Sequence, residues 1–230
     1  RRRGSPLRDG RRPRRRLTTS PPLAVSARGG YGDGMAAPQA SASTDARLRA
    51  SEACCALFIE RGTTALTIAE ISNEIGISER TFYRYFAIKA ESIAPVFDWT
   101  TRTFDDVIAT APPAAPVREV LQQGWRAMLG GTNDARTRLL FPLVFADPEM
   151  WSVFLRKVHD GERALTPLLA PRLGLETDDV RARAASAAVA SATRIALEEM
   201  VIRGADPEES FLRLVDAFDG SLLTANPPGS

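Results

Sequence analysis

The sequence of 230 residues has very few of the side chains that build metal sites or disulfides. Its only histidine is His159, and its only cysteines are the adjacent Cys54 and Cys55, inside a predicted helix. A bridge between neighbouring cysteines would be strained, so we expect two reduced thiols in the core. The alternative, a redox-sensing pair, needs exposed thiols beside positive charge. A transition-metal site is disfavoured because no second histidine and no cysteine lie near His159 in sequence.

Long apolar runs and strand patterns are also absent. No stretch approaches 18 consecutive apolar residues, which excludes a transmembrane helix. The arginine-rich N-terminal segment lacks the apolar core of a signal peptide, so we expect a cytoplasmic protein. Alternating β-branched runs are missing too, and the sequence therefore predicts an all-α fold.

Catalytic motifs are not recognisable in this chain. Asp160 and Glu162, next to His159, are explained more simply as solvated helix residues. A histidine can act as the base of a Ser-His-Asp arrangement, but no nucleophile elbow accompanies this one. We expect no enzymatic activity, no catalytic residue and no cofactor or metal.

Charge is distributed unevenly along the chain. Residues 1–34 contain ten arginines and two aspartates, a net charge of +8, whereas the 20 basic and 26 acidic residues that remain give −6. Residues 1–44, rich in Arg, Gly, Pro, Ser and Ala, are predicted to be a disordered basic arm. The alternative is translated upstream sequence, because Met35 begins a more ordinary N-terminus.

Two adjoining helix signals stand out between residues 67 and 89. Thr67 and Glu70 form a predicted capping box, and Ile68, Ile71 and Ile75 follow at helical spacing. A glycine at position 76 then stops the helix, and a serine at 78 caps the next one. The pattern of helix, tight turn and helix is the helix-turn-helix signature.

The second of these helices has an unusually small apolar stripe. Phe82 and Phe86 are four residues apart and can anchor it to the preceding helix. The other faces carry polar and tyrosine side chains: Glu79, Arg80, Thr81, Tyr83, Arg84 and Tyr85. A solvated amphipathic helix would explain the arginines but not the exposed tyrosines, whose hydroxyls suit phosphate contacts. The composition favours a helix that lies in the major groove of DNA.

With these residues the chain resembles the TetR family of transcriptional regulators. The resemblance covers roughly residues 45–92 and rests on Phe58-Ile-Glu-Arg-Gly62, the segment 67–78, and Thr81-Phe-Tyr-Arg-Tyr-Phe86 with Lys89. Cys54 and Ser72 stand where alanine is common in that family. Glu79 and Arg80 occupy positions that vary within the family and that determine which operator sequence a member prefers.

The resemblance implies particular DNA contacts. Phosphates would be bound by Thr67, Ser78, Tyr83, Tyr85 and Lys89. Base edges, or the sugar-phosphate near them, would be contacted by Glu79, Arg80, Thr81 and Arg84. Arginine suits guanine, threonine a thymine methyl, and glutamate cytosine N4. Because the chain beyond the arm is acidic, binding must rest on a local basic patch, for which the candidates are Arg47, Arg49, Arg61, Arg80, Arg84 and Lys89.

Helix signals continue on both sides of this motif. A first helix is expected from Thr44 or Asp45 to Arg61, with Gly62 as its stop. After the motif a helix runs from Lys89 to about Thr110, although Pro95 should kink it or move its start to about Ala94. Further helices are expected at about 117–129, 133–144, 147–169, 178–203 and 207–223.

Bulky side chains are scattered over the C-terminal helices. Plain core packing explains them most simply, yet the family resemblance implies a small-molecule pocket in this domain, and an aromatic lining favours an apolar or aromatic effector. The pocket candidates are Trp99, Phe104, Trp125, Met128, Phe141, Phe145, Trp151 and Phe154.

Small residues form a smooth face on the next-to-last long helix: Ala184, Ala187, Ala188, Ser191 and Ile195. Such a face lets another helix approach closely, within the chain or from another subunit. The last helix adds Phe211, Leu214, Val215 and Phe218. The resemblance implies that these two helices form a four-helix homodimer interface.

We therefore predict a basic arm (1–44), a helix-turn-helix DNA-binding domain (45–92), a helical effector-binding and dimerisation domain (93–223) and a disordered tail (224–230). The predicted function is a ligand-responsive homodimeric regulator, most simply a repressor that a small molecule releases from a palindromic DNA operator. A DNA-binding regulator without a ligand, and an enzyme that carries such a head, are the alternatives.

Overall fold

The structure is a computed structural model that describes residues 37–218, and the side chains of residues 43–218 apart from Thr132. These residues form α-helices and short 3-10 turns and contain no strand, which confirms the predicted fold class. The first helices are α1 (Ala37–Arg61), α2 (Ile68–Glu74) and α3 (Glu79–Tyr85). A 3-10 turn, η1 (Lys89–Ile93), leads to the second group: α4 (Ala94–Thr110), α5 (Val117–Met128), α6 (Asp134–Ala146), α7 (Pro148–Leu169), α8 (Val180–Arg203) and α9 (Pro207–Phe218).

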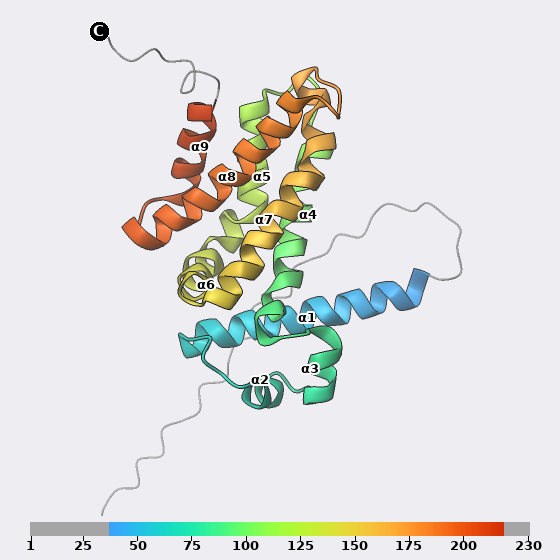
Figure 1. Cartoon of the computed structure of the whole chain (residues 1–230), viewed down its shortest axis with the longest axis vertical. Coiled ribbons are helices and arrows are strands. Elements are labelled where there is room, and N and C mark those ends of the chain that lie inside the picture. The colour runs from blue at the N-terminus through green and yellow to red at the C-terminus, as the bar shows by residue number, and fades with distance from the viewer. Residues whose placement is uncertain (1–36, 219–230) are drawn as a thin grey trace, which may run out of the picture. The chain divides into compact units, whose positions relative to one another are not determined.

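Helices α1–α3 form a small head, with α2 and α3 on one side of α1 (Figure 1). Phe58, Ile71, Phe82 and Phe86 fill its centre and are at most 1% exposed. The two phenylalanines of α3 meet edge to face, with ring centroids 5.1 Å apart. The predicted anchoring of α3 through these rings is therefore confirmed.

Cys54 and Cys55 lie in this core as free, buried thiols. Burial raises the pKa of each thiol to about 12. Such thiols remain protonated at neutral pH and are poor nucleophiles, in agreement with the predicted core role.

Helix α1 begins earlier than expected. It starts at Ala37 rather than Thr44 or Asp45, so the boundary placed at residue 44 was wrong for this helix. Alanine has the highest helix propensity, and Pro38 is tolerated in a first turn, where its missing amide hydrogen has no partner to lose. The predicted disorder of residues 1–36 and 224–230 lies outside the described residues, as does the predicted end of the last helix at 223.

Helices α4–α9 form a bundle in which α4 packs on α5 and α7, and α8 packs on α7 and α9 (Figure 1). Pro95 lies in the first turn of α4, so the start near Ala94 is confirmed and the proline does not kink the helix. Every helix within residues 37–218 is too short or too polar to span a lipid bilayer.

Two glycines allow α4 to approach its neighbours closely. A Cβ atom on Gly124 of α5 would lie 2.8 Å from the Phe104 ring, and one on Gly161 of α7 would lie 3.2 Å from Thr101 Cγ2. Both partners of these glycines are on α4. The spacing of α4 from α5 and α7, and hence the space between them, depends on the absence of side chains at these two positions.

Candidate DNA-binding site and ligand cavity

The turn before α3 is fixed by local hydrogen bonds. The Thr67 Oγ1 atom accepts from the Glu70 amide at 3.2 Å, and Glu70 Oε2 accepts from the Thr67 amide at 2.8 Å, which confirms the capping box. The Thr67 amide is the main reason that the pKa of Glu70 is lowered. Gly76 (φ 74°) ends α2 in a Schellman motif, in which the Ile77 amide donates to the Ser72 carbonyl at 2.9 Å.

Ser78 then caps α3, because its Oγ accepts from the Thr81 amide at 3.1 Å. These contacts orient a helix with two distinct faces. Phe82 is fully buried toward the head, whereas Tyr83 is 55% exposed. Glu79, Arg80 and Arg84 are also exposed, so the polar face of α3 is presented to solvent.

Two predicted phosphate-binding hydroxyls are engaged within the head. Thr67 Oγ1 donates to Glu70 Oε2 at 2.8 Å, and Ser78 Oγ donates to Thr81 Oγ1 at 3.0 Å. A phosphate oxygen only accepts hydrogen bonds, so either hydroxyl would have to exchange its present partner to bind one. Tyr83 has no such engagement among the described residues.

The predicted cations differ in how they are held. Arg80 forms no hydrogen bond or ion pair with any described residue, whereas Arg61 pairs with Glu74 at 2.7 Å. The Arg84 guanidinium lies over the Tyr85 ring, 5.1 Å from its centroid. Lys89 Nζ donates to the Thr64 carbonyl at 2.9 Å and keeps two further donor hydrogens.

Arg47 has a role that the sequence did not reveal. Its Nε donates to the Tyr85 carbonyl at 3.0 Å and so ties α1 to the C-terminal end of α3. A contact across 38 positions leaves no local signal in the sequence. Arg47 therefore supports the recognition helix in addition to supplying charge.

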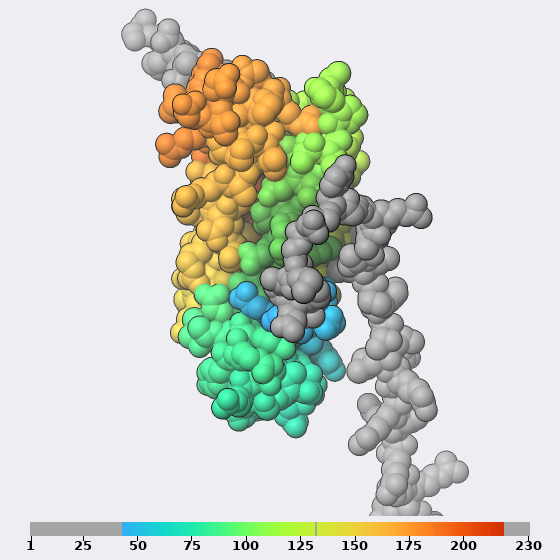
Figure 2. Space-filling view, turned by 90° about the vertical axis from the view of Figure 1, so that its right-hand side faces the viewer, coloured from blue at the N-terminus to red at the C-terminus, as the bar shows by residue number. Residues whose placement is uncertain are grey.

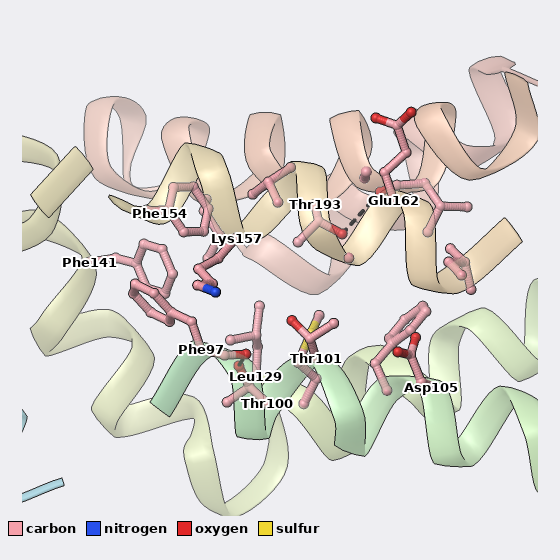
Figure 3. A pocket seen from close by; sticks show the side chains of 18 residues that line it. Phe97, Thr100, Thr101, Asp105, Leu129, Phe141, Phe154, Lys157, Glu162 and Thr193 are labelled. Carbon is pink, nitrogen blue, oxygen red and sulfur yellow. Dashed lines mark hydrogen bonds between the residues drawn. The ribbon is translucent and has the colours of Figure 1, made fainter. Parts of the chain in front are cut away.

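A cavity lies in the bundle between α4, α5, α6, α7 and α8 (Figure 3). Its volume is about 70 Å³, which holds a few water molecules but is far below the roughly 300–1,000 Å³ of an ordinary ligand pocket. It is lined by Phe97, Thr100, Thr101, Phe104, Asp105, Met128, Leu129, Phe141, Phe154, Lys157, Val158, Gly161, Glu162, Leu165, Val189, Ala190, Thr193 and Leu197.

Four of the eight predicted pocket residues line this cavity: Phe104, Met128, Phe141 and Phe154. The other four do not. Trp125 stacks on Phe211 of α9, with ring centroids 4.5 Å apart, and Phe145 packs against Trp151 at 5.1 Å. Trp99 lies on α4, between the lining residues Phe97 and Thr100 in sequence. Because an α-helix turns by about 100° per residue, its side chain points to a different side of the helix.

The lining residues that the sequence did not single out include Phe97, Thr101 and Asp105 on α4. Their spacing of four residues is the available signal for a shared helix face. The sequence does not show which helix faces pack together around the cavity. The predicted set was chosen by ring size, so it missed the polar members of the wall.

Charged side chains line both ends of the cavity, and Figure 3 shows the Lys157 ammonium beside Phe97, Phe141 and Phe154. Figure 3 shows Asp105 and Glu162 toward one end, and Phe97, Phe141 and Phe154 toward the other. The Lys157 ammonium is paired with Asp98 at 3.0 Å and Asp160 at 3.1 Å. Burial lowers the pKa of Lys157, but these two carboxylates outweigh it and the net pKa is raised.

Asp105 is the unusual member of the wall. Burial, and secondarily the neighbouring Asp106 carboxylate, raise its pKa to about 6. Its Oδ1 atom is buried and has no hydrogen-bond partner among the described residues. A buried polar atom without a partner lowers the stability of the folded protein. The Asp105 carboxylate can therefore still accept a hydrogen bond from a ligand.

Helix α7 connects the cavity wall to the head. Thr64 Oγ1, in the loop after α1, donates to Asp147 Oδ2 at 2.8 Å. The other oxygen of that carboxylate caps α7 by accepting from the Glu149 amide at 3.0 Å. Arg156 also pairs with Glu91 of η1 at 2.5 Å, and α7 runs beside α4 on the face shown in Figure 2.

His159 lies on the exposed side of α7, with its Nδ1 3.9 Å from Glu162. In the part of the chain that the structure describes, His, Cys, Asp and Glu side chains form no group of three suited to a metal ion. His159 is thus placed as a surface residue beside the cavity wall.

Known proteins resemble both parts of the chain. Residues 52–91 match the family of bacterial regulatory proteins called the tetR family. The HTH-type transcriptional regulator TcmR of Streptomyces glaucescens is 26% identical over 180 residues, which are 74% of this chain and 78% of TcmR.

Solved structures share the fold beyond the head. The TetR family repressor AlkX from Dietzia sp. strain DQ12-45-1b, implicated in biodegradation of n-alkanes, has a TM-score of 0.56 at 19% identity, covering 77% of this chain and 98% of AlkX. Thermus thermophilus FadR, a repressor in complex with lauroyl-CoA, has a TM-score of 0.54 at 20% identity, covering 80% of this chain and 98% of FadR. In its head the chain is thus similar to the bacterial regulatory proteins of the tetR family, and its fold beyond the head is similar to that of TetR family repressors.

Proposed function

We propose that this protein is a homodimeric repressor that a small apolar or aromatic-containing effector releases from a palindromic operator. The observation that carries the proposal is the course of α7, whose first turn is hydrogen-bonded to the head while its middle lines an apolar cavity. A ligand that moves α7 can thereby alter the position of the head.

We assign residues 45–92 to DNA binding and residues 93–223 to effector binding and dimerisation. On α3, Arg80 and Arg84 are our candidates for base edges, supported by their exposure and by the lack of a carboxylate partner within the described residues. Glu79 and Thr81 complete that set. Phosphate contacts are assigned to Tyr83, Tyr85 and Lys89, and to Thr67 and Ser78 after they exchange their present bonds.

Dimerisation is proposed through α8 and α9. Along α8, the predicted small face stays half-buried or exposed in the single chain. Larger apolar side chains are exposed as well: Ile202 of α8 is 66% exposed, and Phe218 of α9 is 47% exposed. A second copy packed there would cover this apolar surface and would place two recognition helices for the two halves of a palindrome.

The effector can weaken DNA binding only by favouring a dimer state in which the two α3 helices no longer match successive major grooves. We propose α4 and α7 together as the levers. Coupling of about 1–3 kcal/mol would suffice, and operator DNA must then weaken effector binding by the same factor. FadR and AlkX are similar in fold and are named as repressors, FadR with lauroyl-CoA bound, which supports this type of control.

The test begins with an operator selected from random DNA by the full-length chain. A library of small apolar and aromatic compounds is then screened for thermal stabilisation of the protein and for release of the labelled operator. We expect at least one compound to do both, and its affinity to fall when the operator is present. Equal effector affinity with and without operator would rule out the release mechanism.

A regulator without a small-molecule ligand is the second candidate, favoured by the small volume of the cavity. The same screen separates the two functions. A true pocket gives stabilisation that rises with ligand concentration, whereas a ligand-free regulator binds its operator and responds to no compound.

A further inference from the structure

The cavity contains a carboxylate that the chain itself does not satisfy. Asp105 lies on α4 in the cavity wall, and its buried Oδ1 receives no hydrogen bond from a described residue. Thr100, five residues earlier on α4, donates its hydroxyl to the Phe97 carbonyl, and Thr193 across the cavity donates to the Val189 carbonyl. These two hydroxyls are therefore engaged with backbone carbonyls, and Asp105 Oδ1 receives no bond from Thr101, one helical turn earlier, either.

The charged neighbours do not neutralise Asp105 either. The cavity-lining cation, Lys157, is bound by Asp98 and Asp160. Glu162 lines the same end of the cavity, but Figure 3 shows its carboxylate directed away from Asp105. The lining residues of α5, α6 and α8 are uncharged. The end of the cavity that holds Asp105 is consequently electronegative.

The opposite end offers a different surface. Phe97 packs edge to face on Phe154 at 5.5 Å, and Phe154 meets Phe141 at 5.1 Å. All three rings line the cavity. Aromatic faces accept apolar groups and tolerate flat rings. One end of the site thus suits an apolar group and the other a positively charged donor.

We propose that the effector of this protein is an amphiphilic cation, a protonated amine that donates to Asp105 and whose apolar part packs among Phe97, Phe141 and Phe154. This inference rests on the proposed function, because it names the ligand class of the same cavity. A charge-assisted hydrogen bond to a partly desolvated carboxylate is stronger than a neutral one. An anionic ligand would be repelled by Asp105.

The experiment compares two probe series of matched shape: ω-phenylalkylamines, from benzylamine to 6-phenylhexylamine, and the corresponding alcohols. Their affinities for the full-length protein without DNA are measured by calorimetry at pH 7.5. We expect the best amine to bind at least ten times more tightly than its alcohol. This comparison in the wild-type chain needs no variant, so it stands even if a substitution prevents folding.

Asp105→Asn keeps the shape of the side chain and removes its charge. In this variant we expect the amine to lose most of its tenfold advantage, while the alcohol binds within about twofold of its wild-type affinity. The matched control is Asp106→Asn, which removes the same charge from the exposed neighbouring residue and should preserve the amine preference. Circular dichroism establishes that each variant is folded.

Alcohols that bind as tightly as amines, an absence of amine binding, or an unchanged preference in Asp105→Asn would each overturn this inference. Operator release is measured in parallel to separate the two proposals. Release by neutral compounds alone would leave the proposed function in place and refute only the cationic class. Failure of every compound to bind or to release the operator would refute both.

Discussion

The head and the cavity of this protein are held in place by different kinds of interaction. In the head, the ends of α2 and α3 are fixed by side chains and turns within a few residues of each end, as at Thr67, Gly76 and Ser78. In the bundle, α7 and α8 are likewise capped by Asp147 and Asp179, but α4, α5 and α6 begin without a side-chain cap and depend on packing against distant helices. The comparison indicates that the helix ends of α2 and α3 are set locally, whereas three of the helices around the cavity depend on tertiary packing for their ends.

The substitutions with the largest expected effect compare how tightly the head and the cavity wall are packed. Phe82→Ala should remove about 3–5 kcal/mol of unfolding free energy, because the ring is fully buried in the head. Phe141→Ala should cost less unfolding free energy. The Phe141 ring faces the cavity on one side, so it has fewer packing contacts to lose than the Phe82 ring. Chemical denaturation of both variants is the measurement, and an equal loss would contradict the proposed difference in packing.

The polar face of α3 is tested next, by operator binding. Arg80→Ala and Arg84→Ala should each weaken binding to the selected operator by about 1–3 kcal/mol and relax base preference, if each makes a bidentate base contact. Tyr83→Phe and Lys89→Ala should weaken binding to all sequences alike. Arg102→Ala, an equal loss of charge on α4, is the control. Unchanged binding in all four head variants would show that another surface contacts DNA.

Asp105 provides a pH-dependent test of the bundle. Its pKa of about 6 in the folded protein exceeds the ordinary 3.8, so the folded state binds more protons between these values and stability falls as pH rises through this window. Partial exposure reduces the penalty to about 1–2 kcal/mol above pH 6. Asp105→Asn should therefore be more stable than wild type at pH 7 and similar to it at pH 4.

Thermal unfolding across pH 4–8 checks this expectation, with Asp106→Asn as the charge-matched reference. A stability difference that is constant with pH would show that the Asp105 carboxylate is not penalised in the folded state.

The smallest expected effect concerns the connection between the two regions. Thr64→Val keeps the side-chain shape but removes the hydrogen bond to Asp147, at a cost of about 0.5–1.5 kcal/mol. We expect operator affinity to change little, and the factor by which an effector weakens operator binding to shrink. Titration of effector in the presence and absence of operator measures that factor. An unaltered factor would place the coupling elsewhere, for example at Arg156 and Glu91.

The sequence predicted the head well because its signals are short. The capping box at Thr67, the glycine stop at position 76 and the burial of Phe82 each depend on residues within one or two turns. It predicted the cavity less well, because aromatic size does not say which helix faces meet. Trp125 has the size expected of a pocket residue, yet it stacks on Phe211, 86 positions away. The DNA contacts of α3 remain predictions.

The double use of Asp147 has a consequence for redesigning this regulator as a biosensor. One carboxylate both begins α7 and holds the Thr64 loop, whereas the first residue of α7 in the cavity wall is Phe154. Phe154 lies seven positions after Asp147, or about 10 Å along the helix at 1.5 Å per residue. Under the proposed function, the side chains of the cavity wall from Phe154 onward can therefore be exchanged to change ligand preference, while Asp147 and Arg156 preserve the connection with the head. The proposed sensing and the proposed DNA recognition are in this sense separately adjustable parts of one chain.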